Sequence, residues 1–303
     1  MQIKPIQNGV AVEITGVDIT AFDKSSDYDF VRDALYKHLV VVIKNQSTNP
    51  WEYTRFIENI GIGRFVNYNQ FGFTIDAEEY PRDQVVPTNQ WKGDTWRYPV
   101  QRVTGKKKEG KFTGIFGTGK LDWHANLNGP DRADGVALQG WEHCENTSTS
   151  FLNTNLAYND LDPDMLDEIK DLYCEYEYAP EVWAEGLPED QLRRMKQNSN
   201  KYKMWLIQEN LKGVKGLYFY TNNRCELICP DQSLYNEIHD HLFQDKYIYQ
   251  HWWEPGDIVL MDQLLTLHKR DQDDPKILSK RVLHRITFRI SNENGFITRR
   301  NNI

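Results

Sequence analysis

The sequence predicts an α+β fold, in which many strands are accompanied by a few amphipathic helices. Short apolar or alternating segments typical of strands recur along the chain, at 9–20, 39–43, 217–220, 258–261 and 282–290. Apolar residues at helical spacing occur at 30–38, 50–60, 162–172 and 234–243. No repeat of 20–50 residues and no Gly/Ser-rich linker divides the 303 residues, so we expect one domain, 1–303.

The first sixty residues predict two strands and two helices. Residues 9–20 alternate apolar and polar side chains, which predicts a strand that leads into a turn. Residues 30–38 predict a helix, and the β-branched run 39–43 directly after it predicts a buried strand. Asn49 begins a second predicted helix, which ends before Gly61 because glycine commonly follows a helix C-terminus.

The middle of the chain predicts strands and two loop insertions. Residues 64–98 have no lasting period and are rich in Asn, Gln, Tyr and Trp, so we expect a long loop insertion with a functional role. Residues 175–215 are charged and mixed, and they predict a second insertion with one short helix near 189–195. Further strands are predicted at 98–104, 111–116, 135–139 and 148–153.

Composition and charge exclude several classes of protein. With 9 Trp, 16 Tyr, 13 Phe and 39% hydrophobic residues the chain can form a sizeable core, which excludes a disordered protein. The net charge of −8 disfavours binding to nucleic acid, and we expect the lysine-rich segment 105–110 to be a solvated hairpin tip. No signal-peptide pattern and no run of 18 apolar residues occurs, so we expect a cytoplasmic protein with no membrane partner.

Most cysteines and histidines stand alone and predict no site. The four cysteines lack C-x-x-C spacing, so we expect reduced thiols and no zinc; they are Cys144, Cys174, Cys225 and Cys229. Five histidines have no partner motif and are expected to be ordinary core or surface residues; they are His38, His143, His239, His241 and His251.

The segment 121–130, Leu-Asp-Trp-His-Ala-Asn-Leu-Asn-Gly-Pro, contains the pattern to which we assign the chemistry. Non-haem Fe(II) oxygenases hold iron with two histidines and one carboxylate, two of which occur as His-x-(Asp/Glu). Here His124 and Asn126 occupy those positions, and His268 follows 144 residues later (268 minus 124). Neutral imidazole nitrogens are good donors to Fe(II), and three positions stay open for cosubstrate and O2. The sequence therefore predicts a metal site of His124, Asn126 and His268, with an amide in place of the acid.

Four further segments occur in a set order along the chain, at 9–20, 38–46, 254–262 and 281–285. Together with Trp123-His124 and His268, they resemble the TauD/TfdA family of Fe(II)- and 2-oxoglutarate-dependent dioxygenases. The likeness extends nearly from end to end. It rests on the ordered set, because any one of these motifs alone would be unspecific.

This resemblance implies a double-stranded β-helix (jelly roll) core with flanking helices. It implies Fe(II) as the metal and 2-oxoglutarate as the cosubstrate, which becomes succinate and CO2 while O2 oxidises a C–H bond of a small-molecule substrate, usually by hydroxylation. A homo-oligomer is compatible with it. Residues of the aromatic loops are expected to line the substrate pocket; they are Tyr68, Asn69, Trp91, Trp96 and Tyr98.

Arg285 and Arg281 belong to the motif that the resemblance assigns to the cosubstrate. A dianion needs a fixed cation, and a guanidinium offers a planar fork that matches a carboxylate. Arg285 lies 17 residues after His268, which allows a turn and a return along an adjacent strand, and Arg281 four residues earlier shares its strand face. The resemblance also implies that a hydroxyl, from Ser150 or Thr149, binds the cosubstrate carboxylate.

Asn126 leaves several interpretations open. Its amide oxygen can bind iron more weakly than a carboxylate would, with the anionic cosubstrate completing the charge balance. Alternatively, Asp122 or Glu142 replaces the acid, or the chain is a catalytically silent ligand-binding protein on an oxygenase scaffold. Related halogenases have Ala or Gly at this position, which leaves room for halide; Asn fills that room and disfavours halogenation. An engineered exchange of Asp for Asn is a further interpretation.

Overall fold

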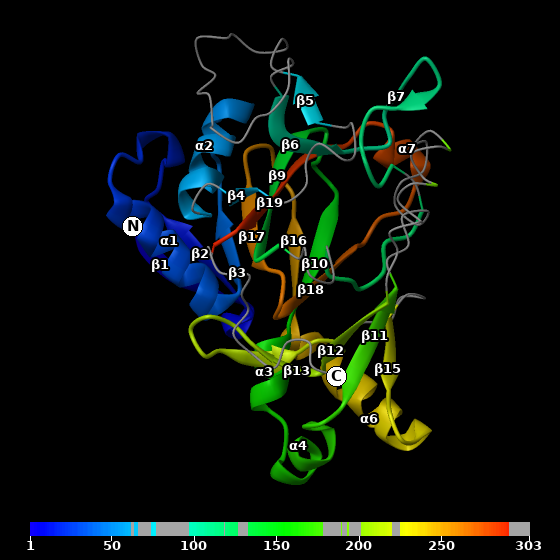
Figure 1. Ribbon diagram of the computed structural model, residues 1–303. Helices are drawn as coiled ribbons and strands as arrows, with labels where there is room; N and C mark the ends of the chain where they lie inside the picture. The colour runs from blue at the N-terminus through cyan, green and yellow to red at the C-terminus, as the bar shows by residue number, and fades with distance from the viewer. Residues whose placement is uncertain are drawn as a thin grey trace.

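The computed structural model describes residues 1–61, 64–65, 74–76, 97–117, 119–126, 133–177, 201–219 and 225–290, together with Glu189 and Arg193. Figure 1 shows an upper body built around sheets, with helices on its left side, and a lower end that carries further strands and helices.

The largest sheet has nine strands within these ranges. Its order is β1–β2–β3–β17–β9–β19–β6–β5, and β4 also pairs with β19. All neighbours are antiparallel except β2 and β3. The strands span Gln2–Ile6 (β1), Ala11–Thr15 (β2), Val40–Ile43 (β3), Arg64–Phe65 (β4), Thr74–Asp76 (β5), Arg97–Val103 (β6), Gly135–Glu142 (β9), Ile258–Asp262 (β17) and Val282–Arg289 (β19).

A smaller sheet faces the large one. Its central strand is β10 (Ser148–Asn153), which pairs antiparallel with β16 (Ile248–Trp252) and β18 (Thr266–Arg270). Side chains from both sheets form one apolar core, since Phe151 of β10 and Tyr249 of β16 pack with residues of β3, β9, β17 and β19. Two sheets that enclose a core in this way form the predicted jelly roll.

The β-branched strand β3 shows how the sequence produces these layers. Val40 and Val42 point into the core between the sheets, whereas Val41 and Ile43 pack under the helices on the other face. A strand that is buried on both faces needs an uninterrupted apolar run, which is the predicted pattern. The covering helices, on the left in Figure 1, are α1 (Ser25–His38) and α2 (Pro50–Ile60).

Helix α2 begins where the sequence predicts it. The Asn49 side chain accepts hydrogen bonds from the backbone N–H groups of Trp51 and Glu52, both at 2.9 Å. The Glu52 carboxylate accepts the backbone N–H of Asn49 at 2.8 Å, which completes a capping box.

The lower end forms a second apolar core against the outer face of the small sheet. Leu152 and Leu267, which alternate with the inward-facing residues of β10 and β18, pack into it. Its helices are α3 (Thr154–Asn159), α4 (Pro163–Ile169) and α6 (Gln232–Leu242). Its strands are β11 (Tyr173–Glu177), β12 (Lys201–Trp205), β13 (Ile207–Glu209), β14 (Lys215–Leu217) and β15 (Cys225–Ile228).

Two predictions about this part of the chain were wrong. Residues 175–215 were expected to be an irregular insertion, yet β12 pairs with β11 over five residues of each strand. The strand expected at 217–220 instead ends at Leu217. Strand β12 was missed because charged and polar residues can occupy a sheet face that meets solvent while the other face packs. The strand at 217–220 was extended too far because Tyr218 and Phe219 are buried in the lower core outside a strand. The helix near 189–195 lies almost wholly outside the described residues.

The lysine-rich tip is itself a small hairpin. Lys107–Lys108 (β7) pairs with Lys111–Phe112 (β8), so strand structure begins inside the expected loop, and the strand expected at 111–116 ends early. The remaining short elements are η1 (Gln7–Gly9), η2 (Ile19–Ala21), η6 (Asp245–Tyr247) and α7 (Pro275–Leu278). Cys144 and Cys174 are buried, and Cys229 is partly buried.

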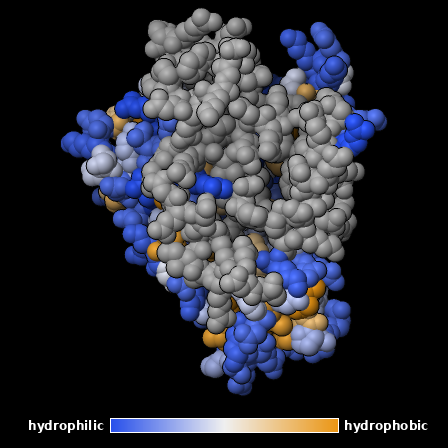
Figure 2. All heavy atoms as spheres, viewed as in Figure 1, coloured by the Kyte–Doolittle hydropathy of each residue, from blue (hydrophilic) through white to orange (hydrophobic). Residues whose placement is uncertain are grey.

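In the visible described surface of Figure 2, hydrophilic residues predominate, and the hydrophobic ones gather mainly toward the lower end. No helix within the described ranges is long and apolar enough to cross a membrane.

His284, on the outer face of β19, makes the fold sensitive to acid. Its ring stacks on Trp141 with centroids 4.2 Å apart, and it is 1% exposed. Burial, with a smaller effect of the Arg102 charge, lowers its pKa to about 3. The unfolded chain therefore takes up this proton near pH 6.5 and the folded chain does not, so stability falls as the pH drops below 6.5 toward 3.

Between pH 7.5 and pH 5, we expect the free energy of unfolding to fall by about 2 kcal/mol more in wild type than in His284→Phe. Denaturant unfolding at both pH values measures it. His239→Ala, on the exposed side of α6, should leave that loss unchanged. An equal pH dependence in wild type and His284→Phe would refute this account of the histidine.

Candidate metal centre and cosubstrate site

His124 and His268 lie side by side although 144 residues separate them (268 minus 124). The backbone N–H of His124 donates to the His268 carbonyl at 3.1 Å, and the N–H of His268 donates to the His124 carbonyl at 3.0 Å. Through this antiparallel bridge, the segment around His124 pairs with β18. The two ring centroids are 4.3 Å apart, with an interplanar angle of 48°.

Its neighbours orient His124. The preceding Trp123 packs against Phe243 at 6.1 Å between centroids, and the Lys269 ammonium lies 4.9 Å from the Trp123 ring. Nδ1 of His124 donates to the Asp122 carbonyl at 2.7 Å, since a carbonyl can only accept. Nε2 therefore keeps its lone pair. Burial lowers the His124 pKa to about 4 against the opposing effect of that carbonyl, so the ring is neutral at pH 7.

His268 packs against Phe151, which is its partner in the register of β10 and β18. The two rings stack with centroids 6.4 Å apart and an interplanar angle of 25°. Burial, then the neighbouring His124 and Arg285, holds the His268 pKa well below its ordinary value. Nε2 of His268 lies 3.0 Å from the amide nitrogen of Asn126, which can only donate, so this Nε2 is also unprotonated.

Asn126 is 7% exposed and is fixed through its backbone. Its N–H donates to Oε1 of Gln263 at 2.7 Å, and Gln263 is fully buried. Within the described part of the chain, Nε2 of Gln263 has no hydrogen-bond partner. The sequence did not single out Gln263, because only the fold shows that this side chain reaches across 137 residues.

Neither acid considered as a substitute approaches the histidines. The Asp122 carboxylate pairs with Lys120 at 2.8 Å, and Glu142 pairs with Lys106; both side chains are about half exposed. Among the described residues, no three His, Cys, Asp or Glu side chains form a group that could hold a metal. The structure therefore gives no support to replacement of the acid by Asp122 or Glu142.

The donor atoms fit a divalent transition metal. Two neutral imidazoles present unprotonated Nε2 atoms on neighbouring rings, and the Asn126 amide lies against one of them. Imidazole nitrogen suits Fe(II), whereas a neutral amide oxygen is a weaker donor than a carboxylate. His124 and His268 would hold such an ion, with Asn126 as a weak third ligand.

Arg285 lies beside the histidines on the inner face of β19. Its Nη1 donates to Oε1 of Gln101 at 2.6 Å, and its guanidinium carbon lies 5.7 Å from the centre of the Phe116 ring. Burial lowers the Arg285 pKa to about 10, so the group stays charged. Its charge acts on both His124 and His268.

Arg281 precedes β19 and is 3% exposed. Burial, followed by the neighbouring Arg270 charge, lowers its pKa to about 9. Its Nη1 has no hydrogen-bond partner among the described residues. Arg281 and Arg285 were expected to share one strand face because they are four residues apart. A register shift between Val282 and Leu283 interrupts the regular alternation of side chains between them.

The two hydroxyl candidates point to opposite faces of β10. Thr149 shares the inner face with Phe151, and its hydroxyl accepts a hydrogen bond from Trp253 Nε1 at 2.9 Å. Ser150 points outward and donates to the Asp271 carboxylate at 2.9 Å. Only Thr149 therefore lies on the face that His268 occupies, and the assignment of Ser150 to the cosubstrate has no structural support.

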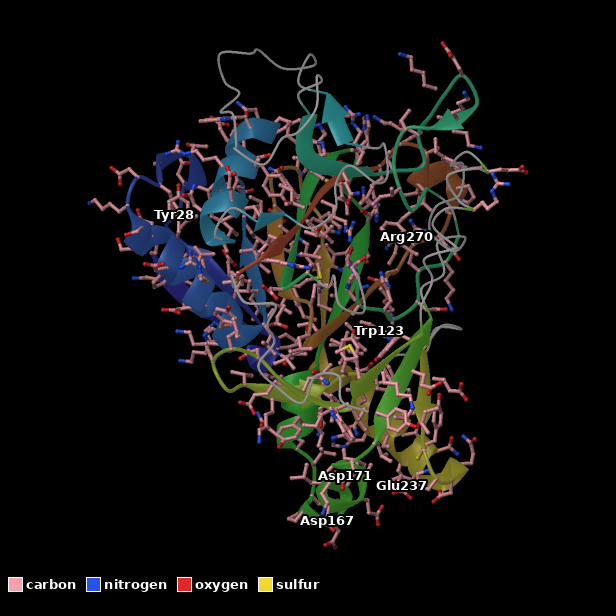
Figure 3. All side chains as sticks on the ribbon, in the orientation of Figure 1. Tyr28, Trp123, Asp167, Asp171, Glu237 and Arg270 are labelled. Atoms are coloured by element: carbon pink, nitrogen blue, oxygen red, sulfur yellow. The ribbon has the colours of Figure 1, made fainter. Side chains whose placement is uncertain are left out.

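Arg270 is an inward-facing cation that the sequence analysis missed. It lies two residues after His268 on β18, and that spacing on a strand was a signal for a shared face. Its guanidinium donates to the carbonyls of Phe116 and Gly119, which ties the segment before His124 to β18. Figure 3 shows Arg270 and Trp123 in the middle of the molecule, whereas Asp167, Asp171 and Glu237 lie at its lower end.

The residues expected to line the substrate pocket lie outside the described part of the structure. This holds for all of Tyr68, Asn69, Trp91 and Trp96, and for the side chain of Tyr98.

Comparison with known proteins identifies the family of the chain. The family described as "Taurine catabolism dioxygenase TauD, TfdA family" matches residues 2–287. The chain belongs to the TauD/TfdA family. Its enzyme class is that of the Fe(II)- and 2-oxoglutarate-dependent dioxygenases, as the sequence predicted.

Individual TauD/TfdA relatives are distant. Pentalenolactone F synthase of Streptomyces arenae is 22% identical over 308 residues, which is 94% of this chain and 94% of that protein. The alpha-ketoglutarate-dependent 2,4-dichlorophenoxyacetate dioxygenase of Burkholderia sp. (strain RASC) is 24% identical over 144 residues, 46% of this chain and 47% of that protein.

Solved structures confirm the predicted jelly roll. The structure of AAD-2 in complex with Mn(II) and N-oxalylglycine superposes with a TM-score of 0.69 at 17% identity, over 97% of this chain and 99% of that one. A taurine dioxygenase from Burkholderia xenovorans gives a TM-score of 0.67 at 17% identity, over 95% and 90%. At this identity the likeness shows the fold alone.

Proposed function

We propose that this TauD/TfdA dioxygenase hydroxylates a C–H bond of a small anionic molecule, with 2-oxoglutarate as cosubstrate. The observation that carries the proposal is the pair of unprotonated Nε2 atoms on His124 and His268, on rings 4.3 Å apart. When bound there, Fe(II) supplies the chemistry by which O2 converts 2-oxoglutarate to succinate and CO2 and oxidises the substrate.

In this proposal, Thr149 and Arg281 bind the distal carboxylate of 2-oxoglutarate. In the register of β10 and β18, Phe151 pairs with His268 and Thr149 pairs with Arg270. Thr149 is therefore two residues along the strand, roughly 7 Å, from the position opposite His268. Such a step suits a five-carbon dicarboxylate that chelates the metal at its other end. The neighbouring Arg270 charge acts on Arg281, and Arg270 is the register partner of Thr149, which supports a position for Arg281 near Thr149.

Arg285 is then available for an anionic group of the substrate. The Arg285 charge acts on both His124 and His268, so Arg285 lies close to the proposed metal position. One 2-oxoglutarate has a single distal carboxylate, and a second buried guanidinium needs its own counter-charge. Two of the relatives are named for 2,4-dichlorophenoxyacetate and taurine, which carry a carboxylate and a sulfonate.

Succinate formation tests this function. Purified protein receives Fe(II), 2-oxoglutarate and O2 with a panel of small carboxylates, sulfonates and matched neutral amides. We expect succinate to rise with at least one anion and to form together with a hydroxylated product. If 2-oxoglutarate binds and no anion or amide raises succinate, the chain is a silent binding protein. Product that incorporates chloride would instead identify a halogenase, which Asn126 disfavours by filling the halide position.

A further inference from the structure

The contact between Asn126 and His268 involves the atom that a metal would need. The amide nitrogen of Asn126 donates to Nε2 of His268 at 3.0 Å. Nδ1 of His268 has no partner among the described residues, so Nε2 is the only ring nitrogen that receives a hydrogen bond. An aspartate at this position would bring a carboxylate, which has no N–H, toward the same lone pair. The amide therefore occupies the Nε2 lone pair that a metal would need, whereas a carboxylate could only accept a hydrogen bond from a protonated Nε2.

The charges around the two histidines also disfavour a metal ion alone. Arg285 acts on both rings, and Arg270 acts on His124. The acid that acts on His124 is Asp122, which is half exposed and paired with Lys120. Two neutral imidazoles and a neutral amide leave the full charge of a divalent ion in this positive field. A dianion bound at the same time would cancel that charge.

We propose that Asn126 makes metal binding depend on 2-oxoglutarate, so that the metal and the cosubstrate are held as a pair and the metal alone is held weakly. This inference rests on the proposed function, because it assumes that the metal and 2-oxoglutarate occupy this site. In the metal-free protein, the Asn126 amide caps Nε2 of His268. Metal entry replaces that hydrogen bond with a neutral oxygen donor, and the negative charge comes from the cosubstrate.

The binding of the metal and the binding of 2-oxoglutarate are thermodynamically linked in this proposal. If 2-oxoglutarate tightens metal binding by some factor, the metal tightens 2-oxoglutarate binding by the same factor. The exchange Asn126→Asp adds a fixed negative charge and removes the N–H that caps His268. It should strengthen binding of the metal alone and weaken its dependence on the dianion.

The experiment uses Mn(II), which gives a spectroscopic signal when free and needs no turnover. The Kd of Mn(II) is measured by electron paramagnetic resonance, with and without saturating 2-oxoglutarate, and corrected for the Mn(II)–2-oxoglutarate complex in solution. In wild type we expect 2-oxoglutarate to tighten Mn(II) binding at least 100-fold, within the usual range of strong coupling. In Asn126→Asp, Mn(II) alone should bind at least tenfold more tightly and the coupling should fall at least tenfold.

Asn236→Asp is the matched control for added charge. Asn236 lies on the exposed side of α6, where its side chain accepts from Gln232, and an aspartate keeps that acceptor. This variant should bind Mn(II) as wild type does. Equal coupling in wild type and Asn126→Asp would overturn the inference while leaving the proposed function intact. If Mn(II) binds to neither protein even with 2-oxoglutarate, the proposed function fails and the inference fails with it.

If Asn126→Asp does not fold, wild type alone can still overturn the inference. A coupling factor below ten in wild type would show that the metal is held without the cosubstrate and would overturn the inference. A factor of 100 or more would support it.

Discussion

The exchange His268→Ala is expected to lower both metal affinity and succinate formation at least about 100-fold. His268 supplies one of two imidazoles, and its Nε2 faces the proposed metal position. Loss of a residue that merely supports a ligand already costs 10- to 100-fold in such sites, and loss of the ligand itself costs more. Mn(II) titration in the presence of 2-oxoglutarate measures the affinity, and product analysis measures the turnover.

The exchange His239→Ala is the control, because that histidine is partly exposed on α6 and its Nδ1 interacts with Asp240. It should retain wild-type metal affinity. His124→Ala should match His268→Ala, since each of the two neighbouring rings offers one unprotonated Nε2 to the metal. Full metal binding by either alanine variant would refute the proposed centre.

The exchange Arg281→Gln is expected to weaken 2-oxoglutarate binding about 30-fold or more. Truncating one partner of a buried, hydrogen-bonded charge pair costs about 2 kcal/mol or more, which corresponds to this factor. Calorimetric titration of 2-oxoglutarate into protein saturated with Mn(II) measures the Kd without any need for the primary substrate. Under the proposed division of roles, Arg285→Gln should change this Kd less than about fivefold and instead abolish substrate-dependent succinate formation.

Arg55→Gln provides the control for loss of a guanidinium, because Arg55 lies on α2 near Trp51, on the outer side of the large sheet. If Arg285→Gln weakens 2-oxoglutarate and Arg281→Gln does not, the roles are exchanged. That outcome would agree with the first expectation from the sequence, which gave Arg285 the leading role.

Most of the upper body could be predicted because its signals are local. The run 39–43 forms a strand buried on both faces, and Asn49 with Glu52 forms a capping box within one helical turn. His124 and His268 could be paired because the family motifs occur in order, although nothing in the residues between them shows that they meet.

The remainder depends on contacts that span the chain. Thr149 and Ser150 are neighbours with the same functional group, and only the register of β10 decides which one faces inward. Gln263 and Gln101 belong to no motif, and each contacts a partner more than 130 residues away in the chain. Strand β12 was missed because its pairing partner β11 lies far enough back in the chain that no hairpin pattern joins them.

The most direct test of the proposed centre is a crystal structure of the protein with Mn(II) and 2-oxoglutarate, with the metal located by its anomalous signal. We predict one peak within bonding distance of Nε2 of both His124 and His268, with the Asn126 amide oxygen turned toward it. A peak that contacts only one of the two imidazoles, or none at this position, would contradict the account.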